Sequence, residues 1–430
     1  MKQTLMRIKN IINKSVNKIS DLFYSLLNKY DLFIYFAVIT FLSVALRVSL
    51  LDCIRGDYTA FLQPWYEKIY LEGASALGKS FGDYTPSYYY LLYILSLFRI
   101  DPESILVLHG IKWISIVFDF VLAIFTSLIC YHLTKDKVKT LLSYTMVLLG
   151  LTVFLNSSLW GQCDSIYVSF CVMAIYFISR NKPNASMISY AFAFCFKIQS
   201  IFILPLFIVM FLRKQFKLKY ILWIPLVYFV MALPSCFLAE NFFVRLGEIF
   251  SIFYNQSVNS YNEVTLNAGS FYALIFTNFK EENFISAFAI YLAIAIIGTY
   301  IFFIYRSKAK FNDRTWLKIA LIFAMIFPYF LPHMHERYFY IVDILVCVYA
   351  LINPKKFYVA ILAIMNSMIG YMVYLWNIPF INVVPQEQSD PTKALSFRFG
   401  AIIYLIAIII VSIDLYKEIY PLGIEENKGE

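Results

Sequence analysis

The chain alternates between long apolar runs and short polar stretches along almost its whole length of 430 residues. Several runs have about 20 residues, the length with which an α-helix crosses the hydrocarbon core of a bilayer. We place apolar segments at 31–51, 86–99, 104–133, 140–156, 160–179, 184–212, 219–237, 284–305, 315–331, 338–352, 356–376 and 397–416. The pattern predicts an all-α, polytopic membrane protein with about 11–13 transmembrane helices and a large first extracytoplasmic loop.

Two stretches do not fit a simple count of crossings. The run 184–212 has basic residues at both ends, so we interpret it as two short helices that meet at Lys197-Ile198-Gln199-Ser200. Broken helices are tolerated in membranes where the freed backbone lines a cavity, which makes this break a candidate site. If the runs 86–99 and 104–133 each crossed the membrane once, the basic cluster at 135–139 would lie on the same side as the first external loop, which is the wrong side. Either the short one is re-entrant or the long one is split.

Charge changes the picture by giving the helices an orientation. The net charge is +9, but the Lys and Arg residues fall in short clusters between apolar runs. Such clusters are typical of cytoplasmic loops, so we predict no nucleic-acid partner. The clusters lie at 135–139, 180–182, 213–219, 306–314 and 355–356. The opposite face then receives 52–85, 156–164, 238–283, 332–337 and 377–396.

Composition sets the domain organisation. Hydrophobic residues make up 61% of the chain and charged residues 15%, which favours one membrane domain over 31–416. Residues 1–30 are basic and amphipathic without a cleavage site, so we predict a helix on the cytoplasmic leaflet, and 417–430 form a cytoplasmic tail. The seven cysteines form no CxxC pair and indicate no disulfide framework or zinc site. Abundant Ile, Phe, Tyr, Lys and Asn favour the plasma membrane of an AT-rich bacterium.

The unusual polar residues fall mostly on the predicted outer side, which is where we expect a reaction site. Two further charges, Lys112 and Asp119, lie inside an apolar run. Each costs on the order of 3 kcal/mol at the centre of a membrane helix, so each is expected to face a partner or a polar cavity. Seven residues apart, they lie on one helical face. They form either an internal ion pair or part of a functional site.

Three short motifs appear in order along the chain. They are WGQCDSIY at 160–167, FKIQS at 196–200 and PHMHERYF at 332–339. They resemble the signatures of the mannosyltransferase family related to the second mannosyltransferase of GPI-anchor synthesis, within the GT-C superfamily of integral-membrane glycosyltransferases. The first loop is similar as well, through 57–66 and 84–88, and so is EVTLNA at 263–268. Ser87 departs from the family, whose members often have proline there.

The resemblance implies a GT-C-like fold and an enzyme that works on the extracytoplasmic face. Its donor would be a polyprenyl-phosphate-linked hexose such as mannose or glucose, and its acceptor a cell-surface glycan, glycolipid or polymer. Members of the superfamily place a catalytic Asp or Glu in the first external loop, and Asp57 matches that position.

The residue chemistry leads to the same candidate base. Transfer of a sugar to a hydroxyl, which we expect to invert the anomeric centre in a single displacement, needs a base for the acceptor proton. Asp57 is the first candidate, although it could instead cap a helix that begins near Thr59. Asp164 is the second candidate, and could equally orient the acceptor or bond to its own loop. Arg55 either pairs with Asp57 or meets a phosphate.

The leaving group in such a reaction is a lipid phosphate, whose growing charge cations can stabilise. We expect Arg337 and Lys197 to bind it, His333 and His335 to donate hydrogen bonds, and Glu336 to hold Arg337. Alternatively, the His-x-His-Glu cluster binds a divalent metal or only caps the helix 338–352. We predict no metal or other cofactor, with the divalent ion as the alternative.

Substrate contacts are expected from residues of the same motifs and loops. The candidates are Arg55, Tyr58, Trp65, Tyr84, Gln162, Gln199 and Asn267. The predicted partners are thus the lipid-linked donor, a glycan or glycolipid acceptor and membrane lipid. Two other functions fit the broken helix and buried charges: a flippase or transporter of a lipid-linked glycan, and a polysaccharide polymerase or ligase. A transporter would hold its site near the membrane midplane.

Overall fold

The computed structural model describes residues 18, 29–258, 264–276, 283–378 and 391–421. The chain divides into two compact units, 1–48 and 49–430, and each is described by itself. The first contains the helix Lys29–Val48. The predicted amphipathic segment 1–30 lies almost entirely outside the described residues, as does most of the predicted tail.

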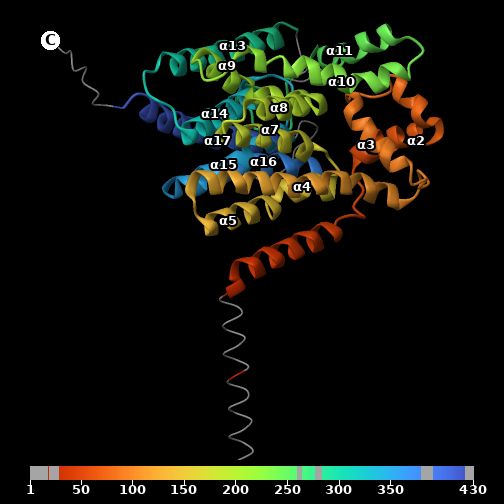
Figure 1. Ribbon diagram of the computed structural model, residues 1–430, viewed down its shortest axis with the longest axis horizontal. Coiled ribbons are helices and arrows are strands. Elements are labelled where there is room, and N and C mark those ends of the chain that lie inside the picture. The colour runs from red at the N-terminus through yellow and green to blue at the C-terminus, as the bar shows by residue number, and fades with distance from the viewer. Residues whose placement is uncertain (1–17, 19–28, 259–263, 277–282, 379–390, 422–430) are drawn as a thin grey trace, which may run out of the picture. The chain divides into compact units, whose positions relative to one another are not determined.

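The second unit is built of helices (Figure 1). Its α-helices are α2 (Gln63–Glu72), α3 (Pro86–Ser96), α4 (Ile105–Thr134), α5 (Lys137–Leu148), α6 (Leu151–Phe154), α7 (Asp164–Ser179), α8 (Pro183–Phe196), α9 (Leu204–Leu212), α10 (Trp223–Phe237), α11 (Phe242–Val258), α12 (Phe271–Ile275), α13 (Asn283–Arg306), α14 (Asp313–Phe330), α15 (Tyr340–Ile352), α16 (Tyr358–Trp376) and α17 (Pro391–Ile419). Short π- or 3₁₀-helices are η1 (Tyr58–Leu62), η2 (Gly73–Gly78), η3 (Leu155–Trp160), η4 (Ile198–Ile203), η5 (Leu218–Tyr220), η6 (Glu336–Phe339) and η7 (Pro354–Lys356). The strands β1 (Thr265–Leu266) and β2 (Met334–His335) pair in parallel.

The prediction of an all-α, polytopic membrane protein is confirmed. In the part of the chain that is described, six helices are long and apolar enough to cross a membrane, or seven if α5 and the bent segment Leu151–Trp160 form one span. The predicted count of 11–13 depends on shorter helices as well, such as Asp164–Ser179 and Ile198–Leu212. That count stays a prediction.

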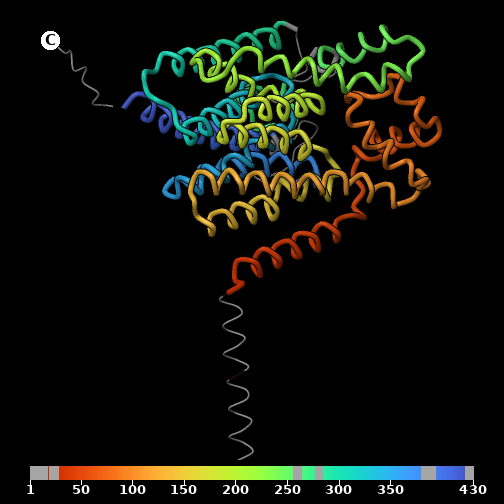
Figure 2. Tube along the Cα trace, in the orientation of Figure 1, coloured from red at the N-terminus to blue at the C-terminus, as the bar shows by residue number. Residues whose placement is uncertain are grey.

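The helices α3 and α4 decide between the two alternatives for the runs 86–99 and 104–133. α4 is one unbroken helix of 30 residues, so the long run is not split. α3 has 11 residues, which spans about 16 Å and is too short to cross a bilayer core of about 30 Å. α2 and α3 lie together near the beginning of α4, while α5 starts at its other end (Figure 2). Of the two alternatives, the short helix is therefore the one that does not cross.

The predicted break in 184–212 is confirmed. α8 ends at Phe196, Lys197 has an extended backbone with φ −155° and ψ 134°, and η4 leads into α9. The rings of Tyr190 in α8 and Phe207 in α9 lie 4.8 Å apart, so the two helices fold back on each other. Lys197 consequently sits at the tip of a helical hairpin.

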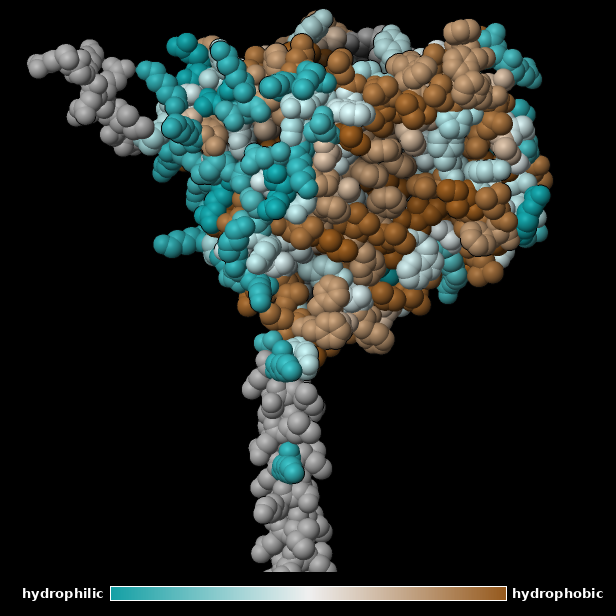
Figure 3. All heavy atoms as spheres, viewed as in Figure 1, coloured by the Kyte–Doolittle hydropathy of each residue, from teal (hydrophilic) through white to brown (hydrophobic). Residues whose placement is uncertain are grey.

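The predicted cytoplasmic clusters meet at one end of the second unit. Arg213, after α9, donates to the carbonyls of Ile304, Ser307 and Ala309, after or at the end of α13. His132 near the end of α4 pairs with Asp313 at the start of α14, with 2.8 Å between Nε2 and Oδ2. Hydrophilic side chains gather toward the left of Figure 3, beside a broad apolar band. The basic loops therefore share one polar end, as the positive-inside pattern requires.

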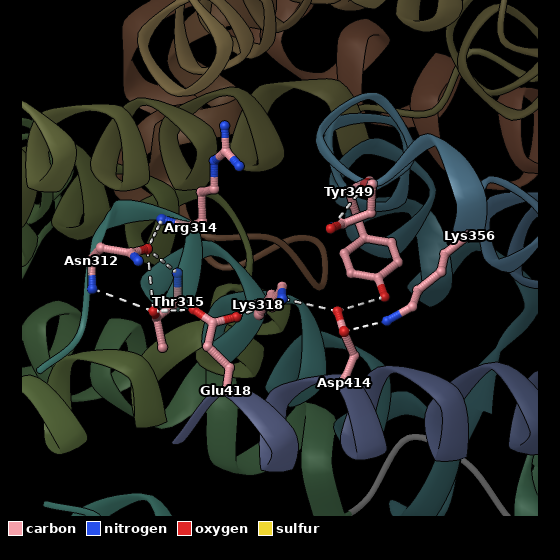
Figure 4. Close-up of polar contacts among 9 residues, drawn as sticks. Asn312, Arg314, Thr315, Lys318, Tyr349, Lys356, Asp414 and Glu418 are labelled. Carbon is pink, nitrogen blue, oxygen red and sulfur yellow. Dashed lines mark hydrogen bonds and ion pairs between the residues drawn. The ribbon is translucent and has the colours of Figure 1, made fainter. Parts of the chain in front are cut away.

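An ion-pair network fastens α17 at this same end (Figure 4). Lys318 of α14 pairs with Asp414 at 2.9 Å and with Glu418 at 2.5 Å. Lys356 pairs with Asp414 from the loop before α16, and Tyr349 donates to Asp414 Oδ2 at 2.9 Å. These contacts bind α14, α15 and α17 together by partly buried charges, each of which has an opposite partner.

Of the two alternatives for Lys112 and Asp119, the internal ion pair is wrong. The Lys112 ammonium donates to the carbonyls of Leu50, Leu51 and Cys53, at 2.7–2.9 Å. Asp119 accepts from the Ser157 hydroxyl at 2.6 Å. Lys112 therefore satisfies the carbonyls of the turn that leads into the first loop, and these hydrogen bonds fix where that loop begins.

Candidate functional site

The first loop is anchored at the beginning of α4. Tyr66 of α2 donates to the carbonyl of Ile100 at 2.8 Å, and Gln63 donates to that of Pro102 at 3.1 Å. Asp57 comes immediately before η1 and makes no capping hydrogen bond to it. The alternative that Asp57 serves only as a helix cap is therefore wrong.

The Asp57 carboxylate instead accepts hydrogen bonds from distant parts of the chain. Its Oδ2 accepts from Trp160 Nε1 at 3.0 Å, from Gln162 Nε2 and from Arg337 at 3.1 Å. Its Oδ1 accepts from the Tyr374 hydroxyl at 2.7 Å. The side chain is 13% exposed. Four side chains from three separate segments thus fix one largely buried carboxylate.

Local backbone geometry explains why Trp160 and Gln162 both reach Asp57. η3 ends at Gly161, whose φ of 83° is a left-handed conformation that glycine adopts without strain. The amide of Gln162 then donates to the carbonyl of Asn156 at 2.8 Å, and α7 begins at Asp164. The turn directs Trp160 and Gln162 to the first loop and Asp164 to the interior.

Asp164 forms a buried ion pair with Lys197. The carboxylate is fully buried, and its Oδ1 bonds to the Lys197 ammonium while its Oδ2 accepts from Asn156 Nδ2 at 2.9 Å. The rings of Tyr84, Tyr167 and Tyr338 surround the ammonium, each with its centroid 5.8 Å away. Aromatic faces attract a cation, so the lysine is held at the hairpin tip from several sides.

The third motif is shaped by β2 and η6. The pairing of β1 with β2 places His335 beside Leu266, and the His333 amide donates to the carbonyl of Val264 at 2.9 Å. The His333 ring nitrogen Nε2 lies 3.0 Å from the Ser286 hydroxyl. Burial and the nearby Arg337 and Lys197 cations hold the pKa of His335 well below its usual range. His335 is therefore neutral at pH 7 and can donate one N–H.

Glu336 does not hold Arg337, which corrects our expectation. The Arg337 guanidinium pairs with Asp57 and lies over the Trp160 ring, 5.3 Å from its centroid. The Glu336 carboxyl is fully buried, and neither oxygen has a hydrogen-bond partner among the residues described. It packs on Gly370 of α16, where a Cβ would lie 2.4 Å from that of Glu336. Burial raises the pKa of Glu336 to about 8.

Replacing Glu336 by glutamine is expected to remove a pH dependence of stability. Between its ordinary pKa of 4.5 and the folded value of about 8, the folded chain keeps a proton that the unfolded chain has lost. The free energy of unfolding of the wild type then falls as pH rises, by up to about 1.4 kcal/mol per pH unit. Thermal unfolding from pH 5 to 8 should show a smaller fall in Tm for Glu336→Gln. Parallel Tm curves would contradict a buried, protonated carboxyl.

These residues border a cavity of about 340 Å³, a size within the range of small-molecule sites. Of the predicted site residues, those that line it are Asp57, Trp65, Tyr84, Gln162, Lys197, Gln199, His333, His335 and Arg337. Those that do not are Arg55, Tyr58, Asp164, Glu336 and Asn267. The structure therefore brings the three motifs and the first loop together, but leaves Asp164 behind the wall as the partner of Lys197.

Three predicted substrate contacts lie elsewhere. Arg55 donates to the carbonyl of Leu375 at 3.2 Å and its guanidinium lies over the Trp376 ring, so it secures the end of α16 and does not pair with Asp57. Tyr58 is buried in the core beneath η1. Asn267 has a positive φ of 55° after β1, and its carbonyl faces Gly370.

Two tyrosines of α16 belong to the site and were not predicted. Tyr374 donates to Asp57 and lines the cavity. The Tyr371 hydroxyl accepts from Asn156, which itself holds Asp164. Both lie in a predominantly apolar run, where a tyrosine is ordinarily read as a core residue, so the sequence carries no signal for them.

The cavity and the ion-pair network lie at opposite ends of the same helices. α7 begins at Asp164 and ends beside Arg180, whose guanidinium is 3.4 Å from His132. α14 begins at Asp313 and leads to the third motif, and α16 runs from the Lys356 loop to Tyr374. The site therefore lies away from the basic loops.

Within the described ranges, no group of three or more His, Cys, Asp or Glu side chains is arranged to hold a metal ion. Neither a protein-family model nor a curated protein sequence matches the chain.

Proposed function

We propose that the chain is a GT-C-like glycosyltransferase of the plasma membrane. It would move a hexose from a polyprenyl-phosphate carrier to a glycan, glycolipid or polymer acceptor on the extracytoplasmic face. The observation that carries the proposal is the convergence on Asp57 of Gln162 and Arg337, from two of the motifs that resemble the mannosyltransferase family. Lys197, from the remaining motif, lines the same cavity.

The cations of the site suit a phosphate leaving group. Arg337 and Lys197 both line the cavity. His335 lines it as well, and the two cations help to keep this histidine neutral. As the bond from the anomeric carbon to the phosphate oxygen breaks, the lipid phosphate leaves with the bonding electron pair. Fixed cations stabilise that growing charge without reorganising. The acceptor oxygen forms the new bond to the anomeric carbon, and its proton passes to Asp57.

An apolar surface adjoins the cavity where a prenyl chain would have to enter. Ile290 of α13 lines the cavity and is 40% exposed. Its neighbours Phe288, Tyr291 and Ile294 are exposed as well. A lipid tail lying on α13 could therefore place its phosphate beside the cations without crossing a polar surface.

The position of the site favours transfer over lipid movement. A transporter is expected to hold its substrate near the middle of the membrane, between two alternately open faces. Asp57 and Arg337 instead lie at the helix ends opposite the basic loops.

The proposal is tested with purified protein in liposomes and a panel of radiolabelled undecaprenyl-phosphate hexoses, with membrane extract as acceptor. We expect label to leave the carrier and appear in extract material for at least one sugar. Absence of transfer with every donor, together with Arg337-dependent movement of the carrier lipid across the bilayer, would indicate a flippase instead.

A further inference from the structure

The two oxygens of the Asp57 carboxylate are not equivalent. A carboxylate oxygen has two lone pairs for hydrogen bonds. Oδ2 already accepts from Trp160, Gln162 and Arg337, so it has no lone pair left for a further proton. Oδ1 accepts from Tyr374, which leaves it one lone pair with respect to the contacts described. Oδ1 is therefore the oxygen that can take a proton from a substrate.

Tyr374 is placed to define the approach to Oδ1. Its ring stacks on Trp160, with centroids 4.7 Å apart and an interplanar angle of 29°. Two of the four hydrogen-bond donors to Asp57 thus belong to one aromatic pair. The tyrosine lines the cavity and is 39% exposed, unlike the buried Trp160. The Oδ1 side of the carboxylate is thus the accessible one.

We infer that Tyr374 is a positioning residue that fixes Oδ1 of Asp57 as the proton-accepting oxygen and directs the acceptor hydroxyl to it. This inference rests on the proposed transferase function and adds the acceptor side of the reaction. The acceptor oxygen bonds to the anomeric carbon while the carrier phosphate leaves with the old bonding pair. The acceptor proton moves to Oδ1. Tyr374 keeps its own proton throughout and prevents the carboxylate from turning.

The inference is tested by Tyr374→Phe, which removes one hydroxyl from an accessible position. Loss of fixed geometry at a reacting group typically costs on the order of 10²-fold in rate. We expect kcat for transfer to fall by about 10- to 100-fold while KM for the lipid-linked donor stays within about twofold, because the phosphate contacts remain. A merely structural tyrosine would change both constants together or neither.

Tyr349→Phe is the matched control. It also breaks a hydrogen bond from a tyrosine to an aspartate, at 2.9 Å to Asp414 (Figure 4). That bond lies at the end of the helices away from the cavity. This control should transfer sugar like the wild type. Active wild type with unchanged kcat in Tyr374→Phe would overturn the inference and leave the transferase proposal standing. Absence of transfer by the wild type with every donor would overturn the proposed function itself.

Discussion

Replacement of Asp57 by asparagine is expected to lower kcat for sugar transfer by about 10²- to 10⁴-fold, the usual contribution of a general base. The amide keeps the size of the carboxylate, and its oxygen can still accept from Trp160 and Gln162. It cannot take the acceptor proton. Because Arg337 keeps its place over Trp160, binding of the lipid-linked donor should persist. Initial rates and donor binding are measured on the same preparation.

Asp52→Asn is the control for this change. Asp52 lies at the start of the first loop, its side chain is 85% exposed, and it pairs with His109 at 2.7 Å. An exposed ion pair contributes little, so this variant should transfer and unfold like the wild type. Transfer by Asp57→Asn at the wild-type rate would rule out Asp57 as the base.

The second large effect is expected for Lys197→Met. It leaves the fully buried Asp164 carboxylate without its cation, and breaking one partner of a buried pair typically costs about 3–5 kcal/mol of stability. The phosphate site loses a charge as well, so transfer should fall too. Thermal unfolding of Lys197→Met should show a large drop in Tm. The double variant Lys197→Met/Asp164→Asn should recover much of the Tm, but not the activity.

The single variant Asp164→Asn, compared with Lys197→Met, decides the role of Asp164. If Asp164 serves to hold Lys197, Asp164→Asn should reduce transfer less than Asp57→Asn does. Complete loss of transfer in Asp164→Asn, with Lys197→Met still active and stable, would make Asp164 the base and contradict the role of its ion pair.

Features with a local cause could be predicted from the sequence. The all-α class follows from the apolar runs, and the hairpin tip at Lys197 followed from a charge and two polar residues in the middle of a run with basic residues at both ends. The clustering of the basic loops at one end followed from the same charge pattern. Each of these depends on properties that a short window of residues carries.

Contacts between distant segments could not be predicted in this way. Arg337 meets Asp57 across 280 positions, and Tyr374 meets it across 317. Because Glu336 and Arg337 are neighbours in the chain, we expected them to pair. Successive residues of a 3₁₀-helix point about 120° apart, however, and this separates their side chains. Proximity likewise suggested Arg55 as a partner of Asp57, whereas Arg55 donates to a carbonyl at the end of α16. Neighbours in the chain are thus poor guides to partners in a site.

Whether the chain transfers sugar through Asp57 is decided by one single-turnover measurement. Protein loaded with a radiolabelled undecaprenyl-phosphate hexose is mixed with excess membrane extract, and the label is followed from the lipid to the acceptor fraction. We predict that the label moves with the wild type and with Asp52→Asn, and stays on the carrier with Asp57→Asn although the donor remains bound. Label that moves equally with Asp57→Asn, or that stays on every carrier with the wild type, would contradict the proposal.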